Sequence, residues 1–332
     1  MDKQRSNIEP KFNENDDPLR QILKGERGED LIENLRENIV SLKEATQKKN
    51  TTRTNTAQKK ALLALNDLGE LLVDKFPYEV PKTGKYSYLP RLLGRARITF
   101  TIERQGTTLG DIIVIADGYT APITAGNFVD LASRGFYTGL PIKSMKKRLS
   151  SPNEDAAKSI NLSVLGSFNE GFYDPLTAKL RRLPLEILRI DKSNGVAEPT
   201  YPKSFLGPSP PIGKISDKLA DPVLSQEVGT RKDNKPVLNF DIPGLVAMNH
   251  PDKNINGASA EFFILSKKEL NRGTSKMFDN TYAPFGYIVN GFDLIENLQP
   301  GDLISSTDAS EWGLLNLQKI KGTNLQDLIG ND

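Results

Sequence analysis

The chain has 332 residues, enough for two domains of ordinary size, and its 44 basic and 42 acidic residues leave a net charge of +2. So small a charge argues against nucleic acid as a partner, because phosphate binding usually needs a strong basic excess. The absence of cysteine excludes disulfides and thiolate-bound metals, and a single histidine, His250, cannot build a histidine-rich metal site. We therefore expect no metal and no other cofactor, and we interpret His250 as a packed or solvated loop residue.

The first 75 residues carry helical patterns. Residues 1–16 are polar and predict a disordered arm, and Asp17-Pro18 is typical of a helix start. Apolar residues then recur at helical spacing over residues 29–48 and again over 57–76, with a polar break at 49–56. Residues 17–75 therefore predict a small helical bundle or hairpin.

Residues 76–95 contain three prolines and predict an extended linker, whose aromatic residues indicate that it packs against another part of the chain. Beyond the linker the pattern becomes alternating. Apolar and polar residues alternate over 98–103, Gln105-Gly106 supplies a turn, and a second apolar run covers 109–116. These segments predict a β-hairpin.

The segment from Tyr119 to Ile142 predicts a short helix, a turn and a strand. Pro122 suits a first helical turn, and Thr124 is a candidate cap for the free amides there. Apolar residues at helical spacing follow, and Gly135 ends the run where a left-handed backbone is needed.

Further strands are predicted along the rest of the chain, at 185–190, 245–249, 261–265, 285–289 and 314–320, with a second short helix at 292–298. Residues 191–241 are rich in proline, glycine and serine and predict a long insertion. The predicted fold is α+β and multidomain: an N-terminal α-helical bundle at 17–75, a linker at 76–95, a closed antiparallel β-barrel capped by two helices at 96–322, and a tail at 323–332.

Several segments in the correct order resemble the cyclophilins, the family of peptidyl-prolyl cis-trans isomerases. They are Leu109 to Ile112, Pro122 to Tyr137, Asn256-Gly257 followed by Glu261 to Ile264, and Asp279 to Gly286. A narrower set resembles the large thylakoid-lumen cyclophilins of plants and cyanobacteria, which join a helical domain to a cyclophilin barrel and assist photosystem II assembly. This set consists of Phe76 to Pro81, Leu92 to Ala96, Ala121 to Asp130 and Leu183 to Ile187.

The resemblance implies a substrate-binding site for a proline-containing segment. Phe263 matches the phenylalanine on the floor of the family's proline pocket, and because neighbours on a strand face opposite sides, either Phe263 or Phe262 belongs to the core. The other candidate binding residues are Met248, Asn249, Glu261, Phe278 and Tyr282.

The catalytic position departs from the family. The family places an arginine there, whose guanidinium contacts the prolyl nitrogen, and Ser144 stands at this position. A serine hydroxyl is a neutral donor and interacts more weakly than a charged one. Lys143, Lys146, Lys147 and Arg148 are nearby cations that could substitute. Glu261 also replaces a pocket glutamine and accepts hydrogen bonds only.

We therefore expect a cyclophilin-family protein that binds proline-containing protein clients as a folding or assembly chaperone, with weak or absent isomerase activity. The alternatives are an active isomerase and, more distantly, a β-barrel that binds a small molecule. The resemblance implies photosystem II subunits as clients and the thylakoid lumen as location. Residues 1–17 contain no hydrophobic signal-peptide region, which leaves the cytoplasm or stroma as the alternative. The linker aromatics also predict contact between the helical domain and the barrel.

Overall fold

The computed structural model describes residues 12, 18–23, 25–80, 86–148, 159–165, 171–175, 177–190, 197–199, 236–251, 254–267, 278, 281–310 and 312–319. The chain divides into two compact units, residues 1–77 and 78–332. Most of the predicted insertion at 191–241 and all of the predicted tail at 323–332 lie outside the described residues. So does the predicted arm at 1–16, except Phe12, which is helical and packs against the core of the first unit.

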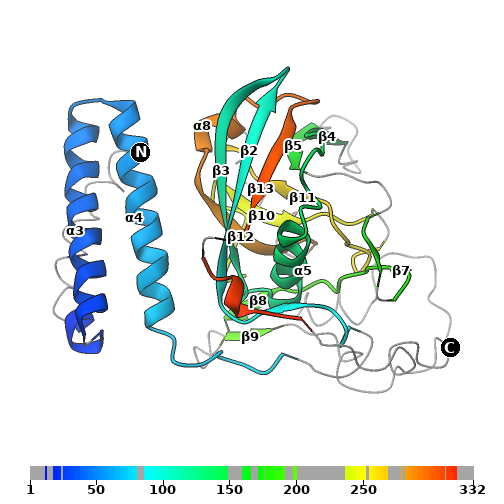
Figure 1. Cartoon of the computed structure of the whole chain (residues 1–332), viewed down its shortest axis with the longest axis horizontal. Helices are drawn as coiled ribbons and strands as arrows, with labels where there is room; N and C mark the ends of the chain where they lie inside the picture. Colours follow the sequence, from blue (N-terminus) through cyan, green and yellow to red (C-terminus); the bar gives the residue numbers. More distant parts are fainter. Residues whose placement is uncertain are drawn as a thin grey trace, which may run out of the picture. The chain divides into compact units, whose positions relative to one another are not determined.

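The first unit is built on a helical hairpin of α3 (Glu26–Gln47) and α4 (Thr51–Leu71), which Figure 1 shows side by side. Its core consists of apolar side chains at helical spacing, namely Leu23, Ile32, Leu35, Ile39, Ala64 and Leu68. This is the amphipathic pattern that the sequence predicts. Among the described residues, no helix is long and apolar enough to cross a membrane.

Helix α4 begins six residues earlier than the sequence pattern predicts. Asn50 is its N-cap, and the Asn50 side chain accepts a hydrogen bond of 3.0 Å from the backbone N–H of Arg53. The hydroxyls of Thr54 and Thr56 donate to backbone carbonyls four residues earlier. The polar side chains in the first turns of α4 therefore form hydrogen bonds within the helix. For this reason the run of polar residues does not interrupt the helix.

The second unit contains mainly short strands. In chain order, its elements are β1 (Arg91–Leu92), β2 (Arg95–Arg104), β3 (Thr107–Asp117), α5 (Pro122–Ser133), β4 (Lys143–Arg148), β5 (Ser159–Leu165), β6 (Tyr173–Asp174), β7 (Lys179–Leu180), β8 (Leu188–Ile190), β9 (Ala197–Pro199), β10 (Leu245–Met248), β11 (Phe262–Ile264), β12 (Ala283–Asn290), α8 (Phe292–Ile295), β13 (Leu303–Asp308), the 3₁₀ helix η4 (Leu314–Asn316) and β14 (Leu317–Gln318).

The main sheet has eight antiparallel strands in the order β13-β2-β3-β12-β10-β11-β5-β4 (Figure 1). The expectation of a closed barrel is wrong, because the two end strands, β13 and β4, form no ladder with each other. The chain before β4 meets the start of β13 at a bridge between Pro141 and Leu303. Hydrogen bonds flank this bridge, from the Ile142 N–H to the Asp302 carbonyl at 2.6 Å and from the Ile304 N–H to the Leu140 carbonyl at 3.0 Å. Neither β13 nor β4 continues this contact as a ladder, so the sheet is curled but is not closed into a barrel.

Inside the curled sheet, aromatic rings from distant segments form the core. Phe128 of α5 lies 5.0 Å, between ring centroids, from Phe262 of β11. Phe100 of β2 stacks on Phe262 at 5.8 Å, and Tyr137 meets Phe262 edge-on at 5.3 Å. Burial raises the pKa of the Tyr137 hydroxyl, which donates to the carbonyl of Ala260 at 3.0 Å. These contacts fix α5 against the sheet.

The start of α5 is capped from a distant segment. Pro122 occupies its first turn as predicted, but Ala121 is the N-cap and provides no side-chain hydrogen bond. The buried carboxylate of Glu186 accepts instead from the backbone N–H groups of Ile123, at 3.2 Å, and Thr124, at 2.6 Å. The Thr124 hydroxyl also donates to Glu186, at 2.7 Å. The expectation that Thr124 caps the helix is therefore wrong: Thr124 is itself a donor to the capping group.

The end of α5 follows the prediction. Gly135 has φ +70°, the left-handed conformation that suits glycine, and its N–H donates to the carbonyl of Ala132. Within the helix, a Cβ on Gly126 would lie 2.6 Å from the backbone of Arg91 and from the carbonyl oxygen of Pro90. Gly126 therefore permits the close approach of α5 to β1.

A buried ionic network attaches the β6–β7 hairpin to α5. The Arg181 guanidinium donates to Asp130 at 2.9 Å, to Asp174 at 2.6 Å and to the side-chain oxygen of Asn127 at 3.1 Å. Burial alone would raise the pKa of Asp130, but Lys319, Arg181 and Arg134 together hold it below its usual value. The network therefore keeps a buried carboxylate ionised and fixes the hairpin in place.

The predicted strands differ in how well they match. Those at 98–103, 109–116, 245–249, 261–265 and 285–289 correspond to β2, β3, β10, β11 and β12. The predicted strand at 185–190 is reduced to β8, and the one at 314–320 is divided between η4 and β14. The second helix, predicted over 292–298, is the one-turn α8. In the main sheet, strands β4, β5 and β13 are not among the predictions.

Candidate functional site

Three neighbouring strands carry most of the predicted binding residues. β10 pairs with β11 so that Ala247 is opposite Phe263 and Met248 is opposite Phe262. On its other side β10 pairs with β12, which places Met248 opposite Ala283. The segment just before β12 carries Tyr282. Residues separated by more than 30 positions therefore meet on one part of the sheet.

The Phe263 cluster is the apolar group formed on one face of these strands. Its members are Phe240, Leu245, Ala247, Phe263, Leu265, Phe278 and Tyr282, with Leu238 packed against them. Three of its members, Phe263, Phe278 and Tyr282, are predicted binding residues. The other members were not predicted, although Leu245 and Ala247 alternate along one strand and Phe263 and Leu265 along the next.

The rings of the Phe263 cluster are in mutual contact. Tyr282 meets Phe263 edge-on with centroids 5.1 Å apart, and Phe278 lies 6.0 Å from Phe263. Phe240 stacks near Phe263 at 6.2 Å and lies 5.4 Å from Phe278. Phe263 is 0% exposed, and Phe278 and Tyr282 are each 1% exposed. A proline ring can therefore contact Phe263 only if the residues that cover it move.

Phe262 belongs to a different environment. Its ring packs with Phe100, Phe128 and Tyr137 in the interior of the curled sheet and not with the Phe263 cluster. Successive strand residues point to opposite faces, which explains the division. The structure thus buries both phenylalanines completely, in two different hydrophobic clusters on opposite faces of β11.

Asn249 and Glu261 form a polar pair beside the cluster. The Asn249 side-chain amide donates to a Glu261 carboxylate oxygen at 2.9 Å, and the Asn249 backbone N–H donates to the Glu261 carbonyl at 2.8 Å. Asn249 is 7% exposed, whereas Glu261 is half-buried. Met248 is buried and immediately precedes the pair. The pair presents a carboxylate near the cluster, so its remaining hydrogen-bonding capacity is for donors.

His250 packs against this site as a buried loop residue. Its ring stacks on Tyr282 with centroids 4.7 Å apart and an interplanar angle of 27°. Its Nδ1 lies 2.9 Å from the carbonyl oxygen of Pro251, and its Nε2 lies 2.9 Å from that of Thr281. Among the residues that the structure describes, no group of histidine, aspartate and glutamate side chains could hold a metal ion.

Ser144, at the position of the family arginine, lies on β4. Its backbone is in register with Ser163 of β5, which in turn is in register with Ile264 of β11. The Ser144 side chain lies outside the described part of the chain, as do those of Lys146, Lys147 and Arg148. Only the positions of these four residues along the strand are therefore established.

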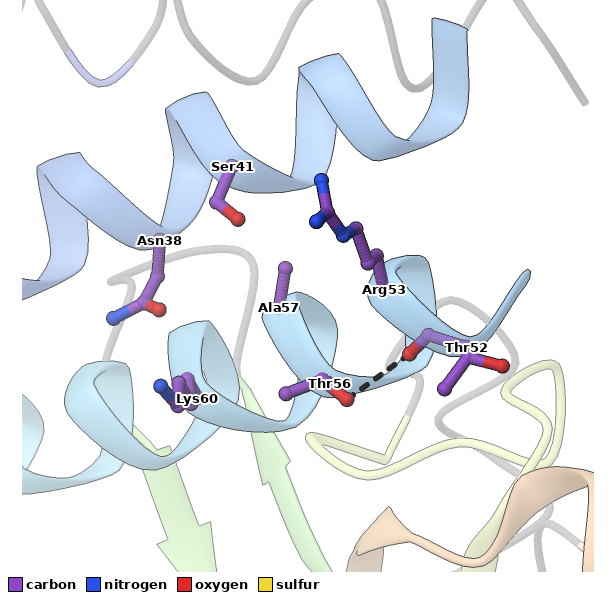
Figure 2. A pocket seen from close by; sticks show the side chains of 7 residues that line it. All are labelled: Asn38, Ser41, Thr52, Arg53, Thr56, Ala57 and Lys60. Atoms are coloured by element: carbon purple, nitrogen blue, oxygen red, sulfur yellow. Dashed lines mark hydrogen bonds between the residues drawn. The ribbon is translucent and has the colours of Figure 1, made fainter. Parts of the chain in front are cut away.

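A polar hollow of about 250 Å³ lies between α3 and α4 in the first unit. Figure 2 shows Ser41 directed from α3 toward α4, where the small side chain of Ala57 leaves room, and Arg53 reaching from α4 toward α3. Asn38, Thr52, Thr56 and Lys60 complete the lining. Arg53, Thr56 and Lys60 are exposed, so water competes for their hydrogen bonds and the hollow offers no desolvated chemistry.

Comparison with known proteins shows which family and which relatives this chain is similar to. The sequence profile of the family described as "Cyclophilin type peptidyl-prolyl cis-trans isomerase/CLD" matches residues 99–174 and 198–322, more than half of the chain. A putative thylakoid lumen peptidyl-prolyl cis-trans isomerase of Synechocystis sp. is 32% identical over 280 residues, which are 84% of this chain and 63% of the relative. The chloroplastic peptidyl-prolyl cis-trans isomerase CYP38 of Arabidopsis thaliana is 30% identical over 298 residues, 89% of this chain and 60% of the relative.

A third relative is more distant. The chloroplastic isomerase CYP37 of Arabidopsis thaliana is 25% identical over 242 residues, which cover 68% of this chain and 42% of that protein. The chain therefore spans about three fifths of the length of the two more similar relatives.

Proposed function

The chain belongs to the cyclophilin-type peptidyl-prolyl cis-trans isomerase family, and from this membership we propose that it binds proline-containing segments of protein clients. In this proposal it acts chiefly as a folding or assembly chaperone and accelerates prolyl isomerisation only weakly. The observation that carries the proposal is the convergence of Phe263, Phe278 and Tyr282 in one apolar cluster beside the Asn249–Glu261 pair.

Apolar recognition suits a proline ring. Burying such a ring against aromatic side chains is favourable by roughly 25 cal/mol per Å² of apolar surface removed from water. The Glu261 carboxylate, which accepts from the Asn249 amide, has further capacity to accept a hydrogen bond from a backbone N–H of a client. Both features support binding, and neither supplies a catalytic charge.

The chemistry of isomerisation supports the second part of the proposal. Amide resonance maintains a barrier of about 18–20 kcal/mol to rotation about a peptide bond. A donor that contacts the prolyl nitrogen accelerates rotation only if this interaction strengthens as the nitrogen loses its planarity. Ser144 offers a neutral hydroxyl at the position of the family's guanidinium, so the gain in the transition state is smaller than with arginine.

The complete burial of Phe263 also favours slow turnover. Client entry requires the Phe263 cluster to open, and the free energy of opening reduces the apparent affinity. An active peptidyl-prolyl isomerase remains the second candidate, which family membership itself favours.

The names of the relatives support a location and a client class. We propose the thylakoid lumen as the location, because two relatives are named as thylakoid lumen and chloroplastic proteins. Photosystem II subunits are the proposed clients, on the strength of the sequence resemblance to the large lumenal cyclophilins. We also propose that residues 17–75 form the helical domain and residues 96–322 the cyclophilin domain.

The proposal is tested with a short alanine-proline peptide, by measuring its binding and its cis-trans exchange rate with the same protein. We expect saturable binding that Phe263→Ala abolishes, and an acceleration far below that of an ordinary cyclophilin. Phe263→Leu keeps an apolar side chain and controls for loss of folding. Acceleration at the usual rate of the family, lost in Phe263→Ala but unchanged in Ser144→Ala, would contradict the weakly catalytic proposal.

A further inference from the structure

The register of β11, β5 and β4 identifies the residue that shares a row with Phe263. Phe263 of β11 is directly opposite Val164 of β5, and Val164 is directly opposite Lys143 of β4. Residues directly opposite each other in antiparallel strands lie on the same face of a sheet. The row that begins in the Phe263 cluster therefore ends at a lysine.

Ser144 occupies a different row. Its position is aligned with Ser163 and Ile264, one residue along each strand from the Phe263 row. A shift of one residue exchanges the two faces of a strand. In the sequence, Ser144 is the residue that aligns with the family arginine. In the strand register, however, Lys143 is the β4 residue that shares a row with Phe263.

From this register we propose that Lys143 provides the cation of the proline-binding site, and that its ammonium group donates to the prolyl nitrogen of a bound client. The proposal rests on the proposed client-binding function. It assigns Lys143 as a catalytic residue that produces the weak acceleration expected of this chain.

Distance and exposure are compatible with this role. Neighbouring strands lie about 4.8 Å apart, so Lys143 and Phe263 stand roughly 10 Å apart across two strand spacings. The four-carbon stem of a lysine can bring its ammonium group over the intervening strand. Lys143 is half-buried, and β4 is the terminal strand of the sheet, so the row leads from a buried ring to an accessible edge.

The charge also explains why the activity should be low. An ammonium group is a strongly hydrated point charge, whereas a guanidinium is planar and can aim two N–H groups. A lysine that must approach across a strand therefore stabilises the twisted amide less than a preorganised arginine does. Lys143 is expected to accelerate rotation by a modest factor and not to match the usual family residue.

The test uses the full chain and an alanine-proline peptide, with the cis-trans rate measured by exchange spectroscopy and binding measured in the same titration. We expect Lys143→Met to reduce the catalysed rate at least about tenfold with little change in peptide affinity. Lys143→Arg should keep or raise the rate. Lys146→Met is the matched control, because it removes the same charge from the other row of β4 and should leave the rate unchanged.

The outcomes separate the two proposals. If the peptide binds but Lys143→Met has the wild-type rate, or if Lys143→Arg loses the acceleration, the Lys143 assignment is wrong while client binding stands. A bound peptide with no wild-type acceleration also overturns the assignment alone. Failure of the wild-type protein to bind the peptide overturns the proposed function and the assignment together.

Discussion

Glu186 shows how one buried side chain can determine where a helix starts. Its carboxylate accepts from two backbone amides and one hydroxyl at the first turn of α5, where the helix dipole also favours negative charge. We predict that Glu186→Ala lowers the free energy of unfolding by about 2 to 3 kcal/mol, because buried donors lose a charged partner. Urea denaturation followed by Trp312 fluorescence measures this change.

The exposed Glu79 provides the control for this prediction, since Glu79→Ala removes the same charge from the same unit at the surface. A loss of stability in Glu79→Ala equal to that in Glu186→Ala would show that net charge, and not capping, is responsible. Glu186→Gln should fall between the wild type and Glu186→Ala, because the amide keeps one acceptor oxygen.

Asp302 provides a test of pH dependence. The hydrogen bonds from Arg104, at 2.6 and 2.8 Å, hold the pKa of Asp302 below the usual value of about 3.9, although burial opposes this. The ionised form is therefore stabilised in the folded state. Its contribution to stability is complete above the unfolded pKa and is lost as the pH falls through the lowered folded pKa.

Unfolding curves of the wild type and Asp302→Asn at pH 7, 5, 4 and 3 measure this effect. We expect the wild type to be the more stable of the two at pH 7 and the difference to shrink as the pH falls below about 4. A stability difference that is constant from pH 7 to pH 3 would disprove the assigned role of Asp302.

At the scale of elements, the attachment of the β6–β7 hairpin to α5 depends on Arg181. Removing one partner of a buried ionic group leaves the others uncompensated, and we predict a loss of about 3 to 5 kcal/mol for Arg181→Met. Arg134→Met removes a pair to the same Asp130 from a side chain that is 37% exposed, and should cost less than about 1 kcal/mol. Chemical denaturation of both variants provides the comparison, and equal losses would contradict it.

The elements also show what the sequence could and could not predict. Strand β2 is clear from alternation because one of its faces is buried, whereas β10 and the second half of β3 appear as short apolar runs that are buried on both faces. Strand β5 carries the same signal, with Ile160, Leu162 and Val164 alternating with polar residues, and could have been found. Strand β13 could not, because Ile304 is its only buried apolar residue, Leu303 is exposed and the remaining residues are polar.

Only part of the candidate site was predictable from the sequence, because pairing between distant strands brings some of its residues together. Phe263, Phe278 and Tyr282 were identified by family resemblance, and they do meet. The contribution of Phe240 and the row that joins Phe263 to Lys143 depend on register between strands far apart in sequence. Glu186 as the cap of α5 depends on the same kind of distant contact, which local propensity does not contain.

At the scale of the whole molecule, the two units have separate cores and different spectroscopic signals. Helices α3 and α4 contribute most of the helical residues described, whereas the single tryptophan, Trp312, packs near Arg97 of β2 in the second unit. We predict that circular dichroism at 222 nm and tryptophan fluorescence give different urea midpoints, because each probe reports mainly one unit. Coincident midpoints and slopes would show that the units unfold as one.

The stacking of His250 on Tyr282 gives the protein a built-in magnetic label. Because the chain has a single histidine, its imidazole produces one set of ring resonances that needs no assignment by mutagenesis. The ring lies 4.7 Å from Tyr282, within the field of the phenol's circulating electrons, and Tyr282 in turn touches Phe263. Any opening of the Phe263 cluster should therefore displace these resonances in the unmodified protein, so that the proposed client entry can be followed through one native side chain.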